Sequence, residues 1–311
     1  MDELVAVAAR RIALGSKSFA TAARLLPQGK RASFYLLYSW CRHCDDVIDN
    51  EKLGFGRNDV EALSPGERLE QIRRQTEAAC RGEGEGHAFL ALSRVLSEHR
   101  LPVRYPLELI DGMEMDARGT RYHSLNDTLS YCYHVAGVVG VMSAIVLGVR
   151  DRPTLERASD LGIAFQLTNI ARDVIADAER GRIYLPSDWL AEHGLDADDL
   201  LQPARRVDLY RVVARLLAVS DDYYKSSTVG IAALPVRSAW AIAAARRIYR
   251  GIGYRIRERG SASWDERIVT SPRAKLAAGG LAGIDALVLT WRSSPEAGSR
   301  EGLWTPRALV A

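Results

Sequence analysis

The sequence predicts an all-α protein, with a single helical-bundle domain over residues 1–291. Apolar residues recur at helical spacing through almost every long segment. Alternating patterns of a length useful for β-strands are absent. No linker is long or polar enough to divide the chain, and 47% hydrophobic with 26% charged residues is ordinary for a globular protein.

Nine segments carry the apolar spacing of a helix, and they define the expected elements. In chain order they are Leu4–Leu14, Ser33–Ile48, Glu67–Cys80, Ala88–Glu98, Tyr105–Ala117, Leu125–Leu147, Leu155–Asp177, Leu209–Tyr224 and Arg237–Arg257. Proline- and glycine-containing stretches separate them. Ser124 and Asn126 are both candidate N-caps for the helix that follows. The tail at 292–311 is polar and rich in Pro and Gly, so we expect it to be flexible.

Charge and apolar runs limit the partners and the location. A formal charge of +3 is too small to indicate nucleic acid as a partner. Met1–Arg11 does not resemble a signal peptide, so a cytoplasmic protein with free thiols is expected. The run Val135–Val149 is shorter than the roughly 20 residues of a membrane-spanning helix and is interpreted as a buried core helix. Peripheral association with the inner face of a membrane stays open.

The segment Trp40–Asn50 (WCRHCDDVIDN) combines a CxxC pair, a histidine and three aspartates. A structural zinc site commonly takes four ligands from two paired clusters, yet Cys80 and Cys132 stand alone. A redox CxxC of the thioredoxin type needs a βαβ context, and this context is helical. We therefore expect Cys41 and Cys44 to be small core residues, with metal or redox chemistry as the disfavoured alternative.

The aspartates of the same segment are more informative. Asp45 and Asp49 lie one helical turn apart on one face. Like charges at this spacing destabilise a helix by roughly 0.2–0.5 kcal/mol unless something bridges them. Their neighbours Val47 and Ile48 are apolar, and carboxylates in such surroundings need a cation or a donor. The alternative is a solvent-exposed face.

A second acidic pair lies on another apolar helix, 128 residues further along. Four polar residues form one stripe at i, i+3, i+7 and i+11, namely Gln166, Asn169, Asp173 and Asp177. Oxygen ligands in pairs are typical of Mg²⁺, which takes one or two carboxylates together with substrate phosphates. A di-iron bundle would need Glu-x-x-His, which is absent. The two motifs predict a cavity in a helical bundle, with facing carboxylate clusters for Mg²⁺ and a diphosphate ligand.

Five stretches, taken in order, form a specific pattern. They are Gly15–Pro27 (GSKSFATAARLLP), Leu37–Asp49 (LYSWCRHCDDVID), Met115–Tyr122 (MDARGTRY), Tyr131–Met142 (YCYHVAGVVGVM) and Ala164–Pro186 (AFQLTNIARDVIADAERGRIYLP). Over about Arg11 to Lys275 the chain resembles the squalene/phytoene synthase family, and within it the bacterial phytoene synthases. One departure is Gly15, where many relatives have His before the serine.

The resemblance implies the isoprenoid synthase fold around a central active-site cavity. It implies a prenyltransferase that joins two geranylgeranyl diphosphates, 1′–1, through prephytoene diphosphate to phytoene, the first committed step of carotenoid biosynthesis. It implies Mg²⁺ or Mn²⁺ and no NADPH. Diphosphate becomes a good leaving group when metal ions neutralise its charge, and an apolar cavity keeps water from a carbocation.

The resemblance also implies roles for individual residues. Metal binding is implied for Asp45, Asp49, Asp173, Asp177 and Asn169. Substrate binding is implied for Ser16, Ser18, Phe19, Gln166, Asn169, Tyr249 and Lys275. Catalytic roles are implied for Arg42 and Arg172 beside the diphosphate, and for Tyr131 and Tyr133 near the carbocation, with Tyr133 favoured. The alternative is a salt bridge to a neighbouring aspartate for each arginine, and a core position with a satisfied hydroxyl for each tyrosine.

Two other functions remain as alternatives. The nearest is a dehydrosqualene or squalene synthase that uses farnesyl diphosphate, with NADPH in the squalene case. The other is a non-catalytic helical assembly protein, against which the four retained aspartates argue. The sequence leaves open the substrate chain length, the number of metal ions, the geometry of the product double bond, the oligomeric state, and any contact with a membrane or with other carotenoid enzymes.

Overall fold

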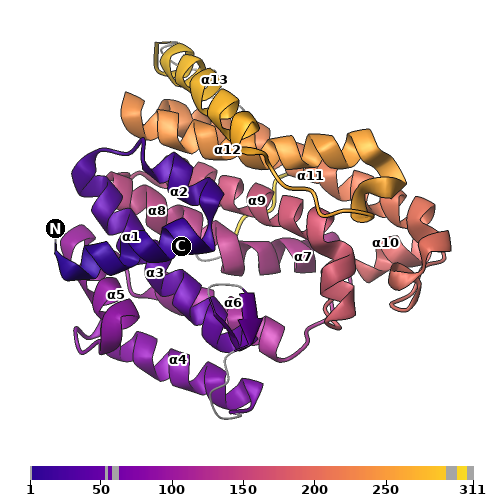
Figure 1. Cartoon of the computed structure of the whole chain (residues 1–311), viewed down its shortest axis with the longest axis horizontal. Coiled ribbons are helices and arrows are strands. Elements are labelled where there is room, and N and C mark those ends of the chain that lie inside the picture. Colours follow the sequence, from indigo (N-terminus) through magenta and orange to yellow (C-terminus); the bar gives the residue numbers. More distant parts are fainter. Residues whose placement is uncertain (1, 53–54, 58–62, 292–299, 307–311) are drawn as a thin grey trace.

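The computed structural model describes residues 2–52, 55–57, 63–291 and 300–306, and this part of the chain is all-α, as predicted (Figure 1). The α-helices are α1 (Glu3–Gly15), α2 (Lys17–Ala23), α3 (Gln28–Asp49), α4 (Pro65–Cys80), α5 (Gly86–His99), α6 (Arg104–Ala117), α7 (Leu125–Cys132), α8 (Val138–Leu147), α9 (Arg152–Glu179), α10 (Ser187–Glu192), α11 (Arg206–Ala232), α12 (Val236–Arg259) and α13 (Pro272–Trp291). The shorter elements are the π-helix η1 (Tyr133–Gly137), the 3₁₀ turns η2 (Asp199–Leu201), η3 (Pro203–Arg205) and η4 (Gly260–Trp264), and the antiparallel strands β1 (Glu51–Lys52) and β2 (Phe55–Arg57).

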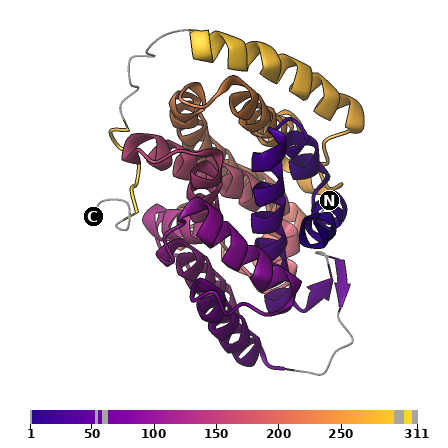
Figure 2. The ribbon, with the colours of Figure 1, turned by 90° about the vertical axis from the view of Figure 1, so that its left-hand side faces the viewer.

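Helix α9 is the central helix of the bundle and packs against α8, η1, α11 and α12. Figure 2 shows α13, in yellow, along the outer edge of the molecule, over α12. The buried apolar side chains form one cluster that runs from Val5 in α1 to Ala286 in α13. Such a shared core is what one domain requires, although the predicted boundary at 291 stays a prediction.

The centre of α9 is buried around most of its circumference. Leu161, Ile163 and Leu167 are at most 7% exposed. The buried polar side chain of Thr168 has partners, since its Oγ1 lies 2.9 Å from the Tyr224 hydroxyl of α11. Buried polar groups are stable only when hydrogen-bonded in this way. The result is a helix whose position is fixed on several sides.

Two glycines let α8 and α9 cross in direct backbone contact. A Cβ on Gly140 would lie 2.3 Å from the carbonyl oxygen of Ala158, and a Cβ on Gly162 would lie 2.2 Å from that of Ala136. Both distances are far below any van der Waals contact. Close helix packing therefore accounts for Gly140, and Gly137 likewise lies against Ser159 and Tyr133.

The apolar segment Leu125–Leu147 is the one stretch, among the described residues, that is long and apolar enough for a membrane span, and 61% of its most apolar window is buried in the bundle. Residues of α8 such as Val138, Val141 and Met142 are fully buried. The interpretation of this run as a core helix is confirmed. Ser124 caps α7 with a capping box, whereas Asn126 lies inside the helix and is not a cap.

Helices α2, α10 and α13 were not among the nine predicted segments. The first two are short, and α13 contains Gly279, Gly280 and Gly283, which interrupt its apolar pattern.

The C-terminal tail also differs from expectation. Arg300 Nη2 lies 2.6 Å from Oδ1 of the buried Asp160, so residues 300–306 are not the loose segment that was predicted. Residues 292–299 and 307–311 lie outside the described part.

Candidate active site

A single large cavity of about 1050 Å³ contains most of the predicted site residues. Ordinary small-molecule sites occupy roughly 300–1,000 Å³. Polar side chains line one part of it, including Ser16, Arg42, Asp45, Asp49, Gln166, Asn169, Arg172 and Lys275. Apolar side chains line the rest, among them Leu26, Phe34, Leu37, Leu147, Leu161 and Leu234. The cavity therefore suits a ligand with a charged head and a long apolar body.

The first acidic motif lies at the end of α3, on one stripe of that helix. Tyr38, Arg42, Asp45 and Asp49 follow at i, i+4, i+7 and i+11, and all of them line the cavity. Burial in the wall raises the pKa of Asp45 to about 7, and Asp49 adds to this increase. Arg42 donates from Nε to Asp46 Oδ1 at 3.1 Å. The salt-bridge alternative thus describes Arg42 in this conformation.

The second motif lies near the end of α9. Arg172 donates to both oxygens of Asp173, one of them at 2.9 Å. Arg267 approaches the same carboxylate at 3.4 Å. Burial raises the pKa of Asp177 to about 7, and the neighbouring Asp173 contributes. Asn169 and Arg172, about two turns and one turn before Asp177, line the cavity directly, whereas Asp173 and Asp177 are not among its lining residues.

Three oxygen groups of the two motifs have no hydrogen-bond partner within the described part of the chain. They are the carboxylates of Asp45 and Asp177 and the buried Oδ1 of Asn169. Buried oxygens without a donor are unfavourable, and a hard divalent cation is the partner that suits them. Among the described residues no three acidic, His or Cys side chains already converge as a metal site. The oxygen-only donor set nevertheless fits Mg²⁺ or Mn²⁺.

An additional carboxylate, Asp116 of α6, links the two motifs and was not predicted as a site residue. Tyr131 donates to its Oδ2 at 3.0 Å, and Tyr184 donates to its Oδ1 at 2.8 Å. The negative charge of Asp116 also contributes to the raised pKa values of Asp45 and Asp177. In the sequence, Asp116 belongs to the MDARGTRY stretch, which contributed to the family resemblance but did not indicate a role for this aspartate.

Arg182, also missed, is the cation within this acidic cluster. Its Nη2 lies 2.6 Å from Oδ1 of Asp49. It also faces Asp116, because the positive charge of Arg182 opposes the effect of burial on the pKa of that carboxyl. The RGRIYLP run contains Arg182 and Tyr184, so both were within a quoted motif. Their contacts became visible only with the packing of the loop after α9 against α3 and α6.

Four aromatic side chains in mutual contact line the cavity. Phe19 lies 5.5 Å, centroid to centroid, from Tyr249 and 6.2 Å from Tyr38. Phe165 stacks on Tyr249 at 4.3 Å. The structure therefore brings the predicted Phe19 and Tyr249 together and adds Tyr38 and Phe165. Aromatic faces present electron density that attracts a cation.

The N-terminal residues of the site are arranged by the start of α2. Ser16 caps this helix, since its Oγ accepts from the backbone N–H of Phe19 at 3.3 Å, and it also lines the cavity. The side chain of Ser18 lies outside the described residues. A Cβ on Gly15 would lie 2.8 Å from the Tyr38 hydroxyl. Glycine at 15 thus leaves room for Tyr38 at the cavity wall.

The two predicted catalytic tyrosines do not line the cavity. Tyr131 gives its hydroxyl to Asp116, and Tyr133 gives its hydroxyl to Glu108 of α6. Both side chains are at most 3% exposed. They match the alternative of core tyrosines with satisfied hydroxyls. Within η1 it is Val135 and Ala136 that reach the cavity, because a π-turn shifts the faces of a helix.

Two further residues that were predicted to bind substrate line the cavity, and the two cysteines of the CxxC pair are not part of a metal or disulfide site among the described residues. Gln166 accepts from Asn169 at 3.4 Å, and Lys275 lines the cavity from the start of α13. Cys41 and Cys44 are free, and Cys44 is fully buried, as expected of core residues.

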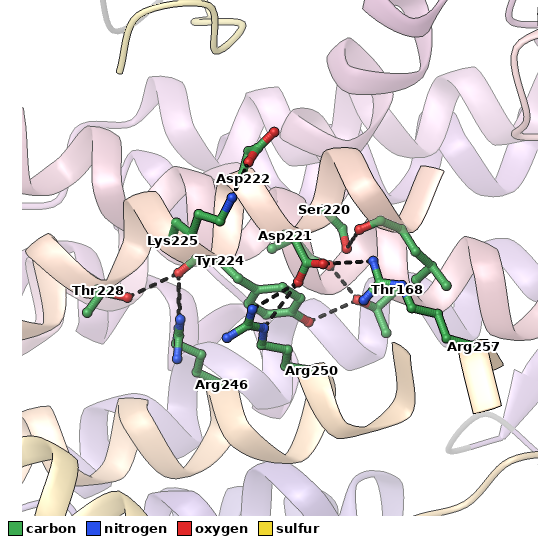
Figure 3. A network of polar contacts seen from close by, with 12 residues as sticks. Thr168, Ser220, Asp221, Asp222, Tyr224, Lys225, Thr228, Arg246, Arg250 and Arg257 are labelled. Atoms are coloured by element: carbon green, nitrogen blue, oxygen red, sulfur yellow. Dashed lines mark hydrogen bonds and ion pairs between the residues drawn. The ribbon is translucent and has the colours of Figure 1, made fainter. Parts of the chain in front are cut away.

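Behind the cavity, α11 and α12 are held together by the polar network of Figure 3. Asp221 accepts from Arg250 at 3.2 Å and from Arg257 at 2.7 Å. Arg246 donates twice to the backbone carbonyl of Tyr224, whose ring lies near Phe165. Ion pairs that are partly buried hold elements in place more than they add stability. This network fixes the helix that carries Tyr249.

Comparison with known proteins agrees with this site. A 15-cis-phytoene synthase of a Paracoccus species is 50% identical over 98% of both chains. One of Enterobacter agglomerans is 47% identical over 94% of this chain and 98% of the relative.

A crystal structure of a dehydrosqualene synthase superimposes with a TM-score of 0.80 at 28% identity, covering 90% of this chain and 95% of that one. The squalene synthase HpnC of Alicyclobacillus acidocaldarius shares the fold, with a TM-score of 0.73 at 24% identity over 83% and 94% of the two chains. The isoprenoid synthase fold expected from the sequence is therefore confirmed. A model of the squalene/phytoene synthase family matches residues 12–276, and the chain belongs to that family.

Proposed function

We propose that this chain is a prenyltransferase that condenses two geranylgeranyl diphosphates into 15-cis-phytoene. Both relatives of about 50% identity carry that name and are matched over nearly their whole length. One observation carries the proposal: a single cavity is lined both by the unpartnered oxygens of Asp45 and Asn169 and by many large apolar side chains. A prenyl diphosphate has the same two-part character.

The oxygen groups would hold the divalent ions. Asp45, Asp177 and Asn169 are the first candidates because their oxygens have no other partner in the described chain. Asp49 and Asp173 become available as further metal ligands when Arg182 and Arg172, which bind them in this structure, turn toward the diphosphate. Mg²⁺ or Mn²⁺ supplies the positive charge that makes diphosphate a leaving group. The guanidinium groups of Arg42 and Arg172 are suited to bind the phosphate oxygens.

The apolar interior protects the reaction from water. Ionisation of one substrate leaves an allylic carbocation, which bonds to the double bond of the second substrate and loses a proton to give prephytoene diphosphate. Loss of the second diphosphate, rearrangement and loss of another proton give phytoene. Two diphosphates leave and no electrons are gained, so the proposal requires no NADPH. Leucine and phenylalanine side chains around the chains exclude water from the cation.

The test is a product assay with the pure full-length chain. It is incubated with Mg²⁺ and either geranylgeranyl or farnesyl diphosphate, without NADPH, and the hydrocarbon is extracted. A C40 product from the first substrate is expected, and chelation of the metal abolishes it. A C30 product from farnesyl diphosphate alone would instead favour the dehydrosqualene activity named for the structural relative. Absence of hydrocarbon from both, with or without NADPH, would overturn the enzymatic proposal.

The location and the partners complete the proposal. Phytoene is a hydrocarbon with no polar group, so release into water is unfavourable. This supports a cytoplasmic enzyme that works at the inner face of a membrane. We propose contact with other enzymes of carotenoid synthesis for the same reason, since such contact would pass phytoene on without release into water.

A further inference from the structure

A helix on the surface of a bundle usually buries its large apolar residues, whereas α13 buries small residues and exposes large apolar ones. The side toward α12 is made largely of small residues: Ala282 and Ala286 are fully buried, and a Cβ added to Gly283 would lie 3.4 Å from the Trp240 ring. Trp240 Nε1 donates to the carbonyl of Gly279 at 2.7 Å. Small residues that permit close approach are typical of helix pairs in lipid, where the large residues face outward.

The outward side of α13 carries the large apolar residues. Leu276 is 79% exposed, Leu281 is 49%, Ile284 is 61% and Val288 is 45%. Leu281, Ile284 and Val288 follow at i, i+3 and i+7 and form one stripe, and Leu276 lies at the edge of the same outward face. A single exposed leucine is ordinary on a soluble protein, but several large apolar residues together on one exposed face mark a surface that contacts an apolar partner. Figure 2 shows that α13 lies at the outer edge of the molecule, where such a partner has access.

Charge around the helix favours an anionic partner. Between Arg267 and Ile284 the chain carries three cations and no carboxylate. Arg273 is exposed at the start of α13, whereas Arg267 and Lys275 line the cavity beside it. The one acidic residue of α13, Asp285, is turned toward α12 and binds Arg247 at 2.7 Å. Basic residues beside exposed apolar ones are the composition of helices that lie in the headgroup region of anionic membranes.

The stripe also begins at the opening of the cavity. Val269 and Lys275 both line the cavity, and Val269 is 70% exposed. Leu276 follows directly on the outer side. The exposed apolar residues of α13 therefore begin beside the cavity lining.

We propose that α13 docks the enzyme on an anionic lipid bilayer, with the outward apolar residues inserted among the acyl chains and Arg273 at the phosphate level. The proposal rests on the proposed function, because it makes the cavity opening continuous with the membrane that supplies and receives prenyl chains. A second copy of this chain would cover the same apolar residues but would offer no anionic partner for Arg273, since the two copies of Arg273 would face one another across a two-fold contact.

The experiment measures sedimentation of the full-length protein with vesicles of phosphatidylcholine alone, or of phosphatidylcholine mixed with phosphatidylglycerol. Wild type is expected to bind the mixed vesicles more tightly, and added salt should weaken this binding. The double variant Leu281→Glu/Ile284→Glu is expected to bind at least about 100-fold more weakly, because two large side chains no longer enter the bilayer. Leu281→Met/Ile284→Leu is expected to keep the affinity.

A matched control places the same charges on another face. Leu90→Glu/Val207→Glu changes residues that are 47% and 54% exposed on α5 and α11, and it should leave vesicle binding unchanged. All four exposed positions should tolerate glutamate, and thermal melting of each variant verifies that the fold is kept.

Three results would overturn the proposal. They are equal binding of wild type and the Leu281→Glu/Ile284→Glu variant, no binding of wild type to either vesicle, or a concentration-dependent dimer that this variant abolishes while vesicle binding is unaffected. The product assay in detergent, with dispersed substrate, is run separately. Failure there would reject the proposed function and leave the vesicle result standing.

Discussion

The two aspartate motifs look alike in sequence and differ in their partners. In α3 the first aspartate, Asp45, has no partner among the described residues, whereas the last, Asp49, is bound by Arg182. In α9 the order is reversed. Asp173, the first, is held by Arg172 and Arg267, and Asp177, the last, has no hydrogen-bonding or ion-pair partner among the described residues. Each motif thus contains one carboxylate that an ion pair compensates and one that is uncompensated in this sense, although the charges of Arg42 and Arg182 partly oppose the raised pKa values of Asp45 and Asp177.

This difference indicates how the site stays folded without its metal. Two uncompensated carboxylates are kept partly neutral, since burial raises the pKa of each to about 7. The other two are neutralised by arginines that can later bind diphosphate oxygens. Removing a compensated or an uncompensated carboxylate should therefore have opposite effects on the stability of the metal-free protein.

The largest effect is expected for Asp45→Asn compared with Asp49→Asn. Loss of the Asp45 carboxylate should lower Mg²⁺-dependent turnover at least about 1,000-fold, since metal-based charge stabilisation contributes several kcal/mol. At pH 8 the same change should stabilise the metal-free protein by about 1–2 kcal/mol, because an ionised group without a partner is removed. Product assays and denaturant titration in chelator measure the two effects.

Asp49→Asn provides the contrast to this variant. It should also lower turnover, but it should destabilise the metal-free protein, because Arg182 loses the carboxylate that it binds. If both variants shift stability in the same direction, the division into compensated and uncompensated carboxylates is wrong.

The second effect is a pH dependence of metal affinity. The folded-state pKa values of Asp45 and Asp177, about 7, lie above the ordinary value of 3.8. The cost of ionising these two carboxyls in the folded metal-free protein is therefore complete above about pH 7, and it shrinks steadily as the pH falls from 7 toward 4, so stability rises over that range. Metal binding needs both carboxylates ionised, so below pH 7 the affinity should fall by about tenfold per pH unit for each proton displaced.

Calorimetric titration of Mg²⁺ with inorganic pyrophosphate, from pH 5.5 to 8, measures this dependence. Asp177→Asn should have a shallower slope than wild type, because one titrating group is gone. An affinity that is flat across this range would contradict the raised pKa values.

Much of the site was readable from the sequence, because it depends on spacing within single helices. The stripe at 166, 169, 173 and 177 follows from helical geometry alone, and the same arithmetic applied to α3 would have added Tyr38 to Arg42, Asp45 and Asp49. The helical fold was readable for the same reason, since periodic apolar faces define the elements of the bundle.

The missing parts depend on contacts between distant segments. Asp116 and Arg182 matter through the packing of α6 and the loop after α9 against α3, which no local pattern reports. The prediction for Tyr133 did not anticipate the π-turn, which directs that side chain to Glu108 and away from the cavity. Helix α13 escaped because its glycines and alanines, which allow close packing on α12, remove the amphipathic pattern.

The third prediction tests the compensating cation itself. Arg182→Gln leaves Asp49 and Asp116 without their arginine, and the side chains of the Arg182–Asp49 pair are only 27% and 25% exposed. The metal-free protein should lose about 1–2 kcal/mol of stability, less than for a fully buried pair. Saturating Mg²⁺ and pyrophosphate should restore part of the loss, since cations then replace the missing charge. Thermal melts with and without both ligands measure this, and a loss that the ligands leave unchanged would mean that Arg182 only packs.

The smallest effect is expected for Arg267→Gln, the matched change at the other motif. Its side chain is 65% exposed and its Nε lies 3.4 Å from Asp173, which Arg172 already binds through both oxygens. An exposed pair of this kind contributes below about 0.5 kcal/mol, so the melting temperature of the metal-free protein should hardly change and salt should remove the remainder. A destabilisation equal to that of Arg182→Gln would show that Asp173 depends on Arg267 as Asp49 depends on Arg182. The two motifs would then be compensated alike, each by one arginine from a distant segment, and the asymmetry between them would be lost.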